Sequence, residues 1–234
     1  MKKSLFFYIF TIFFLIICLL FSAFSNLLKT LSATTEVFAT QEKPIIIIDA
    51  GHGGIDGGTS GKNGILEKEI NLAISKTLAA LFKAGGYNVL ETRTEDILLS
   101  GNAQTHKKQA DLDARLAVAK ANQGAIFISI HQNAFPLPSC RGTQVWYSPN
   151  DPFSADLASA VQSNVKELLQ PQNNRKIKAA TSSIYLLRNM KNPSILVECG
   201  FLSNDEECLL LSTEDYQKKL SLVIFDAISE KIPL

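Results

Sequence analysis

Three short and almost wholly apolar runs of this sequence are each followed by a polar side chain that can bind a metal ion or act as a base. The runs and these side chains are 45–48 with His52, 126–130 with His131, and 195–197 with Glu198. Runs of this length and composition are typical of buried strands in a parallel sheet. Because sites in open α/β sheets form at the carboxyl ends of the strands, we expect these three side chains at one edge of a sheet.

Residues 5–28 carry no charged side chain and follow two lysines, Lys2 and Lys3. The stretch is long enough to cross a bilayer, and the basic residues should keep the N-terminus in the cytoplasm. A buried helix is the weaker interpretation, because a helix that is apolar all round needs a larger protein around it. We therefore expect residues 1–40 to be a signal peptide or a membrane anchor with a short linker, and the rest of the chain to lie outside the cytoplasmic membrane.

Two small-residue patterns are candidate cleavage sites, Ala23-Phe24-Ser25 and Val37-Phe38-Ala39. The second lies well beyond the apolar stretch. The sequence therefore leaves open whether the protein is secreted after cleavage or stays anchored.

Residues 41–234 have the length of one ordinary domain, without an internal repeat or a long Pro/Gly/Ser linker. The net charge of +1, with Lys and Glu residues mixed, argues against binding to nucleic acid. Outside the apolar segment the cysteines are Cys140, Cys199 and Cys208, an odd number without a C-x-x-C pair. A disulfide framework is therefore not expected, although the pattern allows one bridge.

Strand and helix patterns alternate along this part of the chain. Strands are predicted at 44–50, 87–93, 125–131, 142–148, 184–188 and 193–198, and helices at 67–84, 108–122, 153–169 and 215–231. Gly85-Gly86 should end the first helix, because glycine accepts a positive φ. The alternation predicts an α/β fold, a single domain with a mostly parallel twisted sheet of about six strands and helices on both faces.

Six glycines and Asp56 lie between His52 and Glu67. Such a backbone can fold closely around an ion or a ligand before it enters the helix at Glu67. A phosphate-binding loop is the alternative, but neither G-x-G-x-x-G nor G-x-x-x-x-G-K-[ST] is present.

His52, Glu67 and His131 make up a set of three ligands suited to a catalytic zinc ion with one open position. Alternatively, His131 is a buried histidine with satisfied hydrogen bonds and Glu67 is an acidic residue in the first turn of a helix. His106 lies in a polar stretch, and we expect it to be solvated.

Glu198 ends an apolar strand and could be the base and acid that a metal-activated water requires. It could instead be a fourth ligand, or pair with Arg188 or Arg115.

Four ordered motifs carry a resemblance to a known family. They are I-I-I-D-A-G-H-G-G-x-D-G-G, L-E-K-E-I-N-L, F-I-S-I-H-Q-N-A and L-V-E-C-G-F-L-S-N. Together they resemble the zinc-dependent N-acetylmuramoyl-L-alanine amidases of the cell-wall amidase type 3 family, over essentially all of residues 41–234.

The resemblance implies a zinc amidase domain whose ligands are His52, Glu67 and His131 and whose catalytic glutamate is Glu198. Asn71 and Asn133 also fall in the motifs, as substrate-binding or supporting residues. Residues 92–96 and Arg115 match the family too, and buried ion pairing explains them equally well.

Autoinhibited members of this family carry an inserted helix over the zinc, for which the interval between His131 and Glu198 leaves no room. The single domain, with residues 183–188 and 140–144, is similar to the germination-specific amidases of spore-forming bacteria. That likeness implies cleavage of peptidoglycan in the spore cortex, coupled to a deacetylase that forms muramic-δ-lactam, in the space between the forespore membranes.

The expected activity is hydrolysis of the amide between N-acetylmuramoyl residues and L-alanine in peptidoglycan, with Zn²⁺ as cofactor. The alternatives are a vegetative amidase for cell separation, a non-catalytic wall-binding protein, and a zinc deacetylase. The sequence leaves open whether a partner protein must activate the enzyme.

Overall fold

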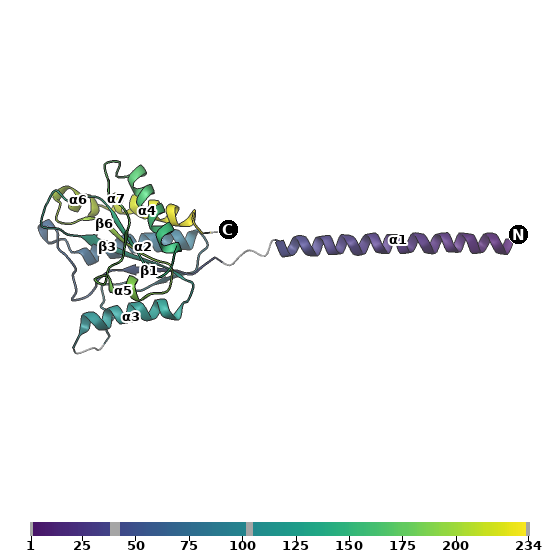
Figure 1. Cartoon of the computed structure of the whole chain (residues 1–234), viewed down its shortest axis with the longest axis horizontal. Coiled ribbons are helices and arrows are strands. Elements are labelled where there is room, and N and C mark those ends of the chain that lie inside the picture. Colours follow the sequence, from purple (N-terminus) through teal and green to yellow (C-terminus); the bar gives the residue numbers. More distant parts are fainter. Residues whose placement is uncertain (1, 38–42, 102–104, 233–234) are drawn as a thin grey trace. The chain divides into compact units, whose positions relative to one another are not determined.

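The computed structural model describes residues 2–37, 43–101 and 105–232. The chain divides near residue 42 into an N-terminal unit, which contains helix α1 (Lys2–Val37), and a second unit that contains every other element (Figure 1). Within α1, Thr11–Thr30 have a mean hydropathy of 2.3, and α1 is the one described helix long and apolar enough to cross a membrane. A signal sequence has the same features. Residues 38–39 of the second candidate cleavage site lie outside the described residues.

The second unit is built on a six-stranded sheet with the order β2-β1-β3-β6-β4-β5. The strands are β1 (Ile46–Ala50), β2 (Val89–Glu91), β3 (Ile126–Asn133), β4 (Gln144–Tyr147), β5 (Lys178–Ala179) and β6 (Ser194–Phe201). Strands β2, β1, β3 and β6 pair in parallel, and β4 runs antiparallel to β6. The expected α/β fold with a mostly parallel sheet is confirmed.

Six α-helices and one short 3-10 helix accompany this sheet. They are η1 (Lys62–Gly64), α2 (Glu67–Ala84), α3 (Lys107–Ala121), α4 (Phe153–Leu168), α5 (Tyr185–Asn189), α6 (Asp205–Leu211) and α7 (Glu214–Ser229). The four predicted helices correspond to α2, α3, α4 and α7, and α2 has the predicted bounds. Gly86, with φ +77°, supplies the positive φ just after α2.

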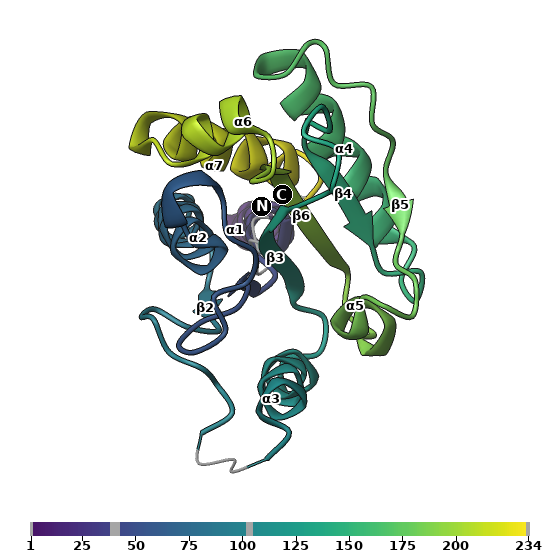
Figure 2. The ribbon, with the colours of Figure 1, turned by 90° about the vertical axis from the view of Figure 1, so that its left-hand side faces the viewer.

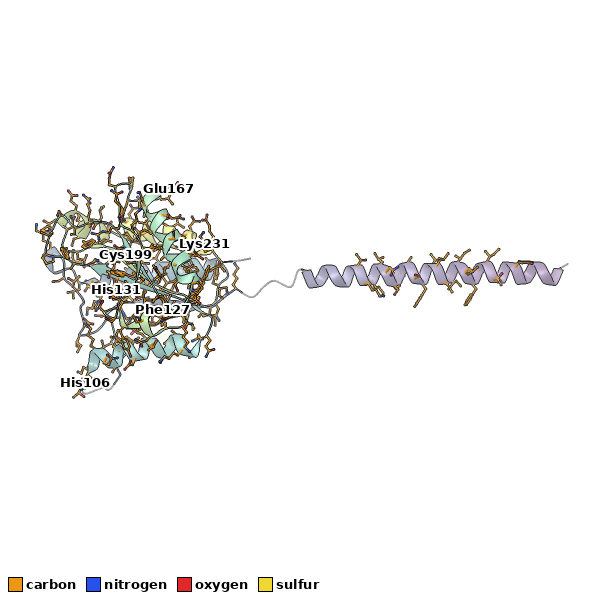
Figure 3. The ribbon with its side chains drawn as sticks, in the orientation of Figure 1. His106, Phe127, His131, Glu167, Cys199 and Lys231 are labelled. Carbon is orange, nitrogen blue, oxygen red and sulfur yellow. The ribbon has the colours of Figure 1, made fainter. Side chains whose placement is uncertain are left out.

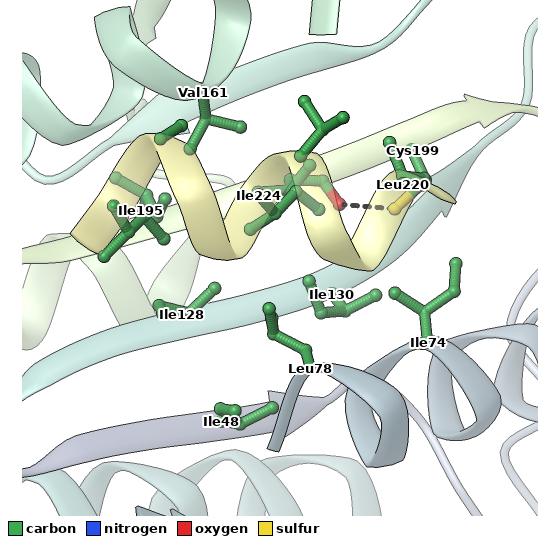
Figure 4. Packing of buried hydrophobic residues seen from close by; sticks show 14 of the residues in the cluster. Ile48, Ile74, Leu78, Ile128, Ile130, Val161, Ile195, Cys199, Leu220 and Ile224 are labelled. Atoms are coloured by element: carbon green, nitrogen blue, oxygen red, sulfur yellow. Dashed lines mark hydrogen bonds between the residues drawn. The ribbon is translucent and has the colours of Figure 1, made fainter. Parts of the chain in front are cut away.

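Alternate residues of the central strands point to opposite faces of the sheet, and both faces are covered. Ile48, Ile128 and Ile195 pack with side chains of α2, α4 and α7 on one face (Figure 4). Ile47 and Phe127 pack with α3 and α5 on the other. Strands that are buried on both faces read as continuous apolar runs, which is why they stand out in the sequence.

The strand predicted at 184–188 is wrong, because these residues lie almost wholly within the short helix α5. Consecutive residues Leu186 and Leu187 are both buried, one in the cluster of Ile47 and Phe127 and the other against Leu196. A helical turn lets two adjacent side chains enter neighbouring clusters on one side, whereas a strand would send them to opposite faces. The sequence patterns also missed α6 and the two-residue strand β5.

The carboxyl ends of β1, β3 and β6 lie side by side at one edge of the sheet, which faces the viewer in Figure 2. Asp49 is in register with Ser129, and His131 is in register with Glu198. Figure 3 shows His131 at this end of β3 and Phe127 further back along the same strand. The topology therefore brings the polar residues that follow the three apolar runs to one place.

Candidate metal centre

His52, Glu67 and His131 meet at this edge of the sheet. Oε1 of Glu67 lies 2.9 Å from Nδ1 of His131 and 3.3 Å from Nε2 of His52. One ligand atom from each of the three residues lies within 4.8 Å of the others, so the group could hold a metal ion. The two imidazole rings meet edge to face, with their centroids 4.9 Å apart.

Each of the three side chains comes from a different element. His52 lies in the loop after β1 with φ +60°, a left-handed conformation that non-glycine residues seldom adopt. Glu67 is the first residue of α2, and His131 lies in β3 where the pairing with β6 shifts register before Asn133. The left-handed backbone of His52 is strained, and such strain persists only where the surrounding structure holds it, commonly at functional sites.

The carboxylate of Glu67 is buried and fixed by its neighbours. The backbone N–H of Thr59 donates to Oε2 (2.9 Å), and the backbone N–H of Gln132 donates to Oε1 (3.0 Å). Burial alone would raise the pKa of Glu67, but hydrogen bonds and charge interactions with His131 and His52 outweigh it and lower that pKa far below its usual range. Glu67 is therefore an ionised carboxylate, the form that binds a metal.

His52 is oriented by Asp56, whose Oδ2 lies 2.9 Å from Nδ1 of the imidazole. The other oxygen of Asp56 accepts a hydrogen bond from the backbone N–H of Gly58 (3.1 Å). Burial opposes the charged form of His52, but hydrogen bonds with Glu67 and Asp56 raise its pKa. A carboxylate on one ring nitrogen directs the other nitrogen towards a metal, and here that nitrogen, Nε2, is the one facing Glu67.

Two glycines let the loop pass close to these side chains. A Cβ atom on Gly51 would lie 2.3 Å from the ring of His131. A Cβ atom on Gly58, which has φ +69°, would lie 2.5 Å from Oε2 of Glu67. The glycine-rich loop therefore does fold closely around the three residues, as the sequence indicates.

Glu198 projects from β6 beside His131, its register partner. Burial raises the pKa of Glu198 to about 7, and the nearby charges of His131, Glu67 and His52 act on it as well. Its Oε2 is buried and has no hydrogen-bond partner among the described residues. Glu198 pairs with neither Arg188 nor Arg115 there, so the ion-pair alternative is wrong.

Arg115 instead belongs to a buried network beneath the loop. Its guanidinium pairs with Asp49 and Asp111 and donates to the backbone carbonyls of Ala50 and His52. Asp49 also accepts hydrogen bonds from Thr92 and Ser129, each 2.7 Å long.

Arg93 holds the same loop from another side. It donates to the carbonyls of Ala50 (2.9 Å) and Gly51 (3.0 Å). Buried ion pairing thus accounts for Arg115, and both arginines fix the backbone that carries His52.

The two asparagines in the motifs differ in what they contact. The buried amide of Asn71 donates to Oε1 of Glu67 and to the carbonyl of Gly51, each over 3.2 Å, and accepts from Nε2 of Gln132. The side chain of Asn133 makes no hydrogen bond to any described residue, whereas its carbonyl accepts from the N–H of Leu202. Asn71 is therefore a supporting residue in this structure.

Sequence reasoning gave no role to Asp56 or Gln132. The spacing of Asp56, four residues after His52 in a glycine-rich loop, was the available signal. His106 is exposed just before α3, as expected, and lies away from His131 (Figure 3). Cys140, Cys199 and Cys208 are free thiols.

Comparison with known proteins agrees with this geometry. Residues 46–230 match the family described as N-acetylmuramoyl-L-alanine amidase. The germination-specific N-acetylmuramoyl-L-alanine amidase of Bacillus subtilis is 33% identical over 187 residues, covering 79% of this chain and 78% of the relative. The uncharacterized protein YqiI of the same organism is 34% identical over 208 residues, covering 88% of this chain and 93% of that protein.

Among solved structures, the CwlD amidase of Clostridioides difficile, in complex with the GerS lipoprotein, superposes with a TM-score of 0.75. It is 38% identical, and the match covers 80% of this chain and 98% of that one. The family match spans almost the whole second unit, including His52, Glu67, His131 and Glu198. The chain belongs to the N-acetylmuramoyl-L-alanine amidase family and is related to the spore-cortex amidases.

Proposed function

We propose that this protein is a zinc-dependent amidase that cleaves the bond between N-acetylmuramoyl residues and L-alanine in peptidoglycan. His52, Glu67 and His131 hold the zinc ion, and Glu198 moves the proton. The observation that carries the proposal is the convergence of two imidazoles and an ionised carboxylate beside a buried glutamate whose Oε2 has no partner among the described residues.

The donor set fits zinc. Bonds of about 2.0–2.1 Å in a tetrahedral arrangement place neighbouring ligand atoms roughly 3.3 Å apart. The distances from Oε1 of Glu67 to the two imidazole nitrogens are 2.9 and 3.3 Å, and all three ligand atoms lie within 4.8 Å of one another. Three protein ligands leave a fourth position for water or substrate, as catalytic zinc sites require.

When bound, zinc supplies Lewis acidity towards the amide carbonyl and the attacking water. Glu198 accepts the proton of that water and then donates it to the amine of L-alanine as the amide bond breaks. Burial of the carboxyl group raises the pKa of Glu198 and so helps it to hold the proton between the two steps. Asp56 and Asn71 keep His52 and Glu67 in position throughout.

Digestion of purified sacculi tests this function. The full-length protein in detergent should release stem peptides that begin with a free L-alanine amine, which mass spectrometry identifies. A wall-binding protein would sediment with the sacculi and release nothing, and a deacetylase would release acetate and leave the peptides attached. Glu198→Gln is the matched control for contaminating hydrolases.

Related proteins favour action in the spore cortex. One relative, 33% identical, is named as germination-specific. Removal of the peptide exposes the lactyl carboxyl of muramic acid, with which a deacetylated amine can close the muramic-δ-lactam. Cortex from spores that lack the protein should contain no lactam, and lactam should return with the wild-type chain but not with Glu198→Gln. Normal lactam with chained vegetative cells would support cell separation instead.

Helix α1 indicates where the enzyme acts. Polymerised peptidoglycan lies beyond the cytoplasmic membrane, and Thr11–Thr30 can direct the domain there. Fractionation should find the second unit in the membrane fraction or in an exported, soluble fraction, and a full-length chain in the cytosol would contradict export. N-terminal sequencing then separates the two forms: an intact Met1 means an anchor, and a new terminus near Ser25 or Ala39 means cleavage.

A further inference from the structure

A cavity of about 550 Å³ lies apart from the three candidate ligands, at the same edge of the sheet. Its walls are the loop before β4, the loop after α4, and residues of α6 and α7. The residues that matter for its chemistry are Arg141, Arg175, Asn173, Glu207 and Tyr216.

Two arginines give this cavity its charge. Arg175 is half-buried, with its guanidinium carbon 4.4 Å from the centroid of the Phe201 ring. Its Nε donates to the carbonyl of Arg141 (2.7 Å), and its two terminal nitrogens make no hydrogen bond within the part of the chain that the structure describes. Arg141 is exposed and lies 3.3 Å from Glu206. A guanidinium held by a ring face and by Nε presents its remaining N–H groups in a fixed direction, which suits a carboxylate.

The acidic group in the cavity leaves these N–H groups available. Both oxygens of the buried Glu207 accept backbone hydrogen bonds, from Gly142 (2.8 Å) and Phe201 (2.9 Å). Neither arginine hydrogen-bonds to Glu207 among the described residues. An incoming anion therefore need not displace a hydrogen-bond partner from the terminal nitrogens of Arg175, which interacts with Glu207 through charge alone.

Phe201, whose ring packs against the guanidinium of Arg175, relates the cavity to the position of Glu198 on β6. Phe201 is three residues beyond Glu198 on β6, but the strand is irregular there and these residues span only two residues of β3, which corresponds to roughly 7 Å. Phe201 also pairs with Asn133, two residues after His131. An extended peptide covers at most about 3.6 Å per residue, so the second and third residues after the cleaved bond reach this distance.

We infer that this cavity binds a carboxylate of the stem peptide, carried by its second or third residue, through Arg175 with the support of Arg141. The inference rests on the proposed function and adds to it a determinant of substrate choice. The enzyme then distinguishes stem peptides with a free carboxylate from those in which the same group is an amide.

A pair of synthetic muramoyl peptides tests the inference, identical except for carboxylate or carboxamide at the second and third residues. The wild-type enzyme should cleave the carboxylate form with a kcat/KM about tenfold higher, chiefly through a lower KM. In Arg175→Gln this ratio should fall to about one. Arg141→Gln, at an exposed position that cannot disturb folding much, should lower the ratio partly. Arg188→Gln, which removes an exposed arginine of α5, should leave the ratio at the wild-type value.

Equal rates for both substrates with the wild type would overturn the inference while leaving the amidase activity standing. So would an unchanged preference in both Arg175→Gln and Arg141→Gln. Failure of the wild type to cleave either substrate would overturn the proposed function, and the inference with it. Because the attraction is electrostatic, the wild-type preference should also shrink at 1 M salt, a measurement that needs no variant.

Discussion

Nδ1 of His131 lies 2.9 Å from Oε1 of Glu67, although 64 residues separate them along the chain. The contact joins the end of β3 to the first turn of α2, and the backbone N–H of the residue after His131 reaches the same oxygen. Oε1 of Glu67 is thus the point at which strand, helix and loop meet. Substitutions around this atom should separate metal binding from catalysis.

His131→Ala should lose its zinc and its activity. Only two ligands would remain, too few for a stable zinc site. Elemental analysis of the purified protein measures the metal directly. His106→Ala is the control. Because His106 is exposed and lies away from the site, this variant should keep about one zinc per chain and full activity. Full zinc occupancy in His131→Ala would rule out the proposed ligand set.

Glu198→Gln should keep its zinc and lose activity by on the order of a hundredfold or more, the usual contribution of a positioned proton-transfer group. The amide keeps the shape of the side chain but cannot take a proton from water. Rates on a soluble muramoyl peptide, together with metal content, decide this. A folded variant that lacks zinc would show that Glu198 is a ligand.

Asp56→Ala should weaken zinc binding by about 10- to 100-fold, the usual effect of removing a carboxylate that orients a metal-binding histidine. Asp56→Asn retains a hydrogen-bond acceptor for Nδ1 of His52 and should lie between this variant and the wild type. Competition with a chromophoric chelator gives the affinities. The exposed Asp215→Asn serves as the control, and an affinity unchanged in Asp56→Ala would show that Asp56 does not orient His52.

Asp49→Ala should lower the free energy of unfolding by about 3–5 kcal/mol, because it leaves the buried guanidinium of Arg115 without one of its two carboxylate partners. Urea denaturation measures the change. Lys219→Ala removes an exposed pair with Asp215 on α7 and should change stability little. A similar small effect for both variants would mean that the Asp49–Arg115 pair does not hold the loop.

The stability of the metal-free protein should depend on pH through Glu198. Burial raises its pKa from 4.5 to about 7, so between these values the folded state binds more protons than the unfolded state. Stability attributable to this group is therefore complete below pH 4.5 and is lost as the pH rises through 7.

Glu198→Gln cannot ionise and should escape this loss. After treatment with a chelator, it should be more stable than the wild type at pH 8 by up to about 3 kcal/mol, and at pH 5 by less than about 1 kcal/mol. Urea denaturation of both proteins at the two pH values measures the difference in their free energy of unfolding. Groups that titrate in both proteins cancel in this difference. An equal gain at both values would point to a cause other than ionisation.

Much of the secondary structure and of the candidate site could be predicted from local sequence. The apolar runs that became β1, β3 and β6 stand out because both faces of the sheet are covered, so nearly every residue in them is apolar. Helix α2 has its predicted bounds because apolar side chains recur at helical spacing and two glycines follow it. His52, His131 and Glu198 stood out as candidates because each follows one of these apolar runs, and Glu67 because it begins the helix.

Tertiary contacts decided the rest. Residues 184–188 have the composition of a strand, yet Leu186 and Leu187 fill two clusters made by distant elements, and only a helical turn can do this. The role of Asp56 depends on the conformation of a loop that Arg93 and Arg115 hold from elsewhere in the chain. The raised pKa of Glu198 and the cavity beside Arg175 depend on burial and on packing between elements. Local periodicity reports which face of an element is apolar, but burial, register and charge environment arise only when elements far apart in the sequence come together.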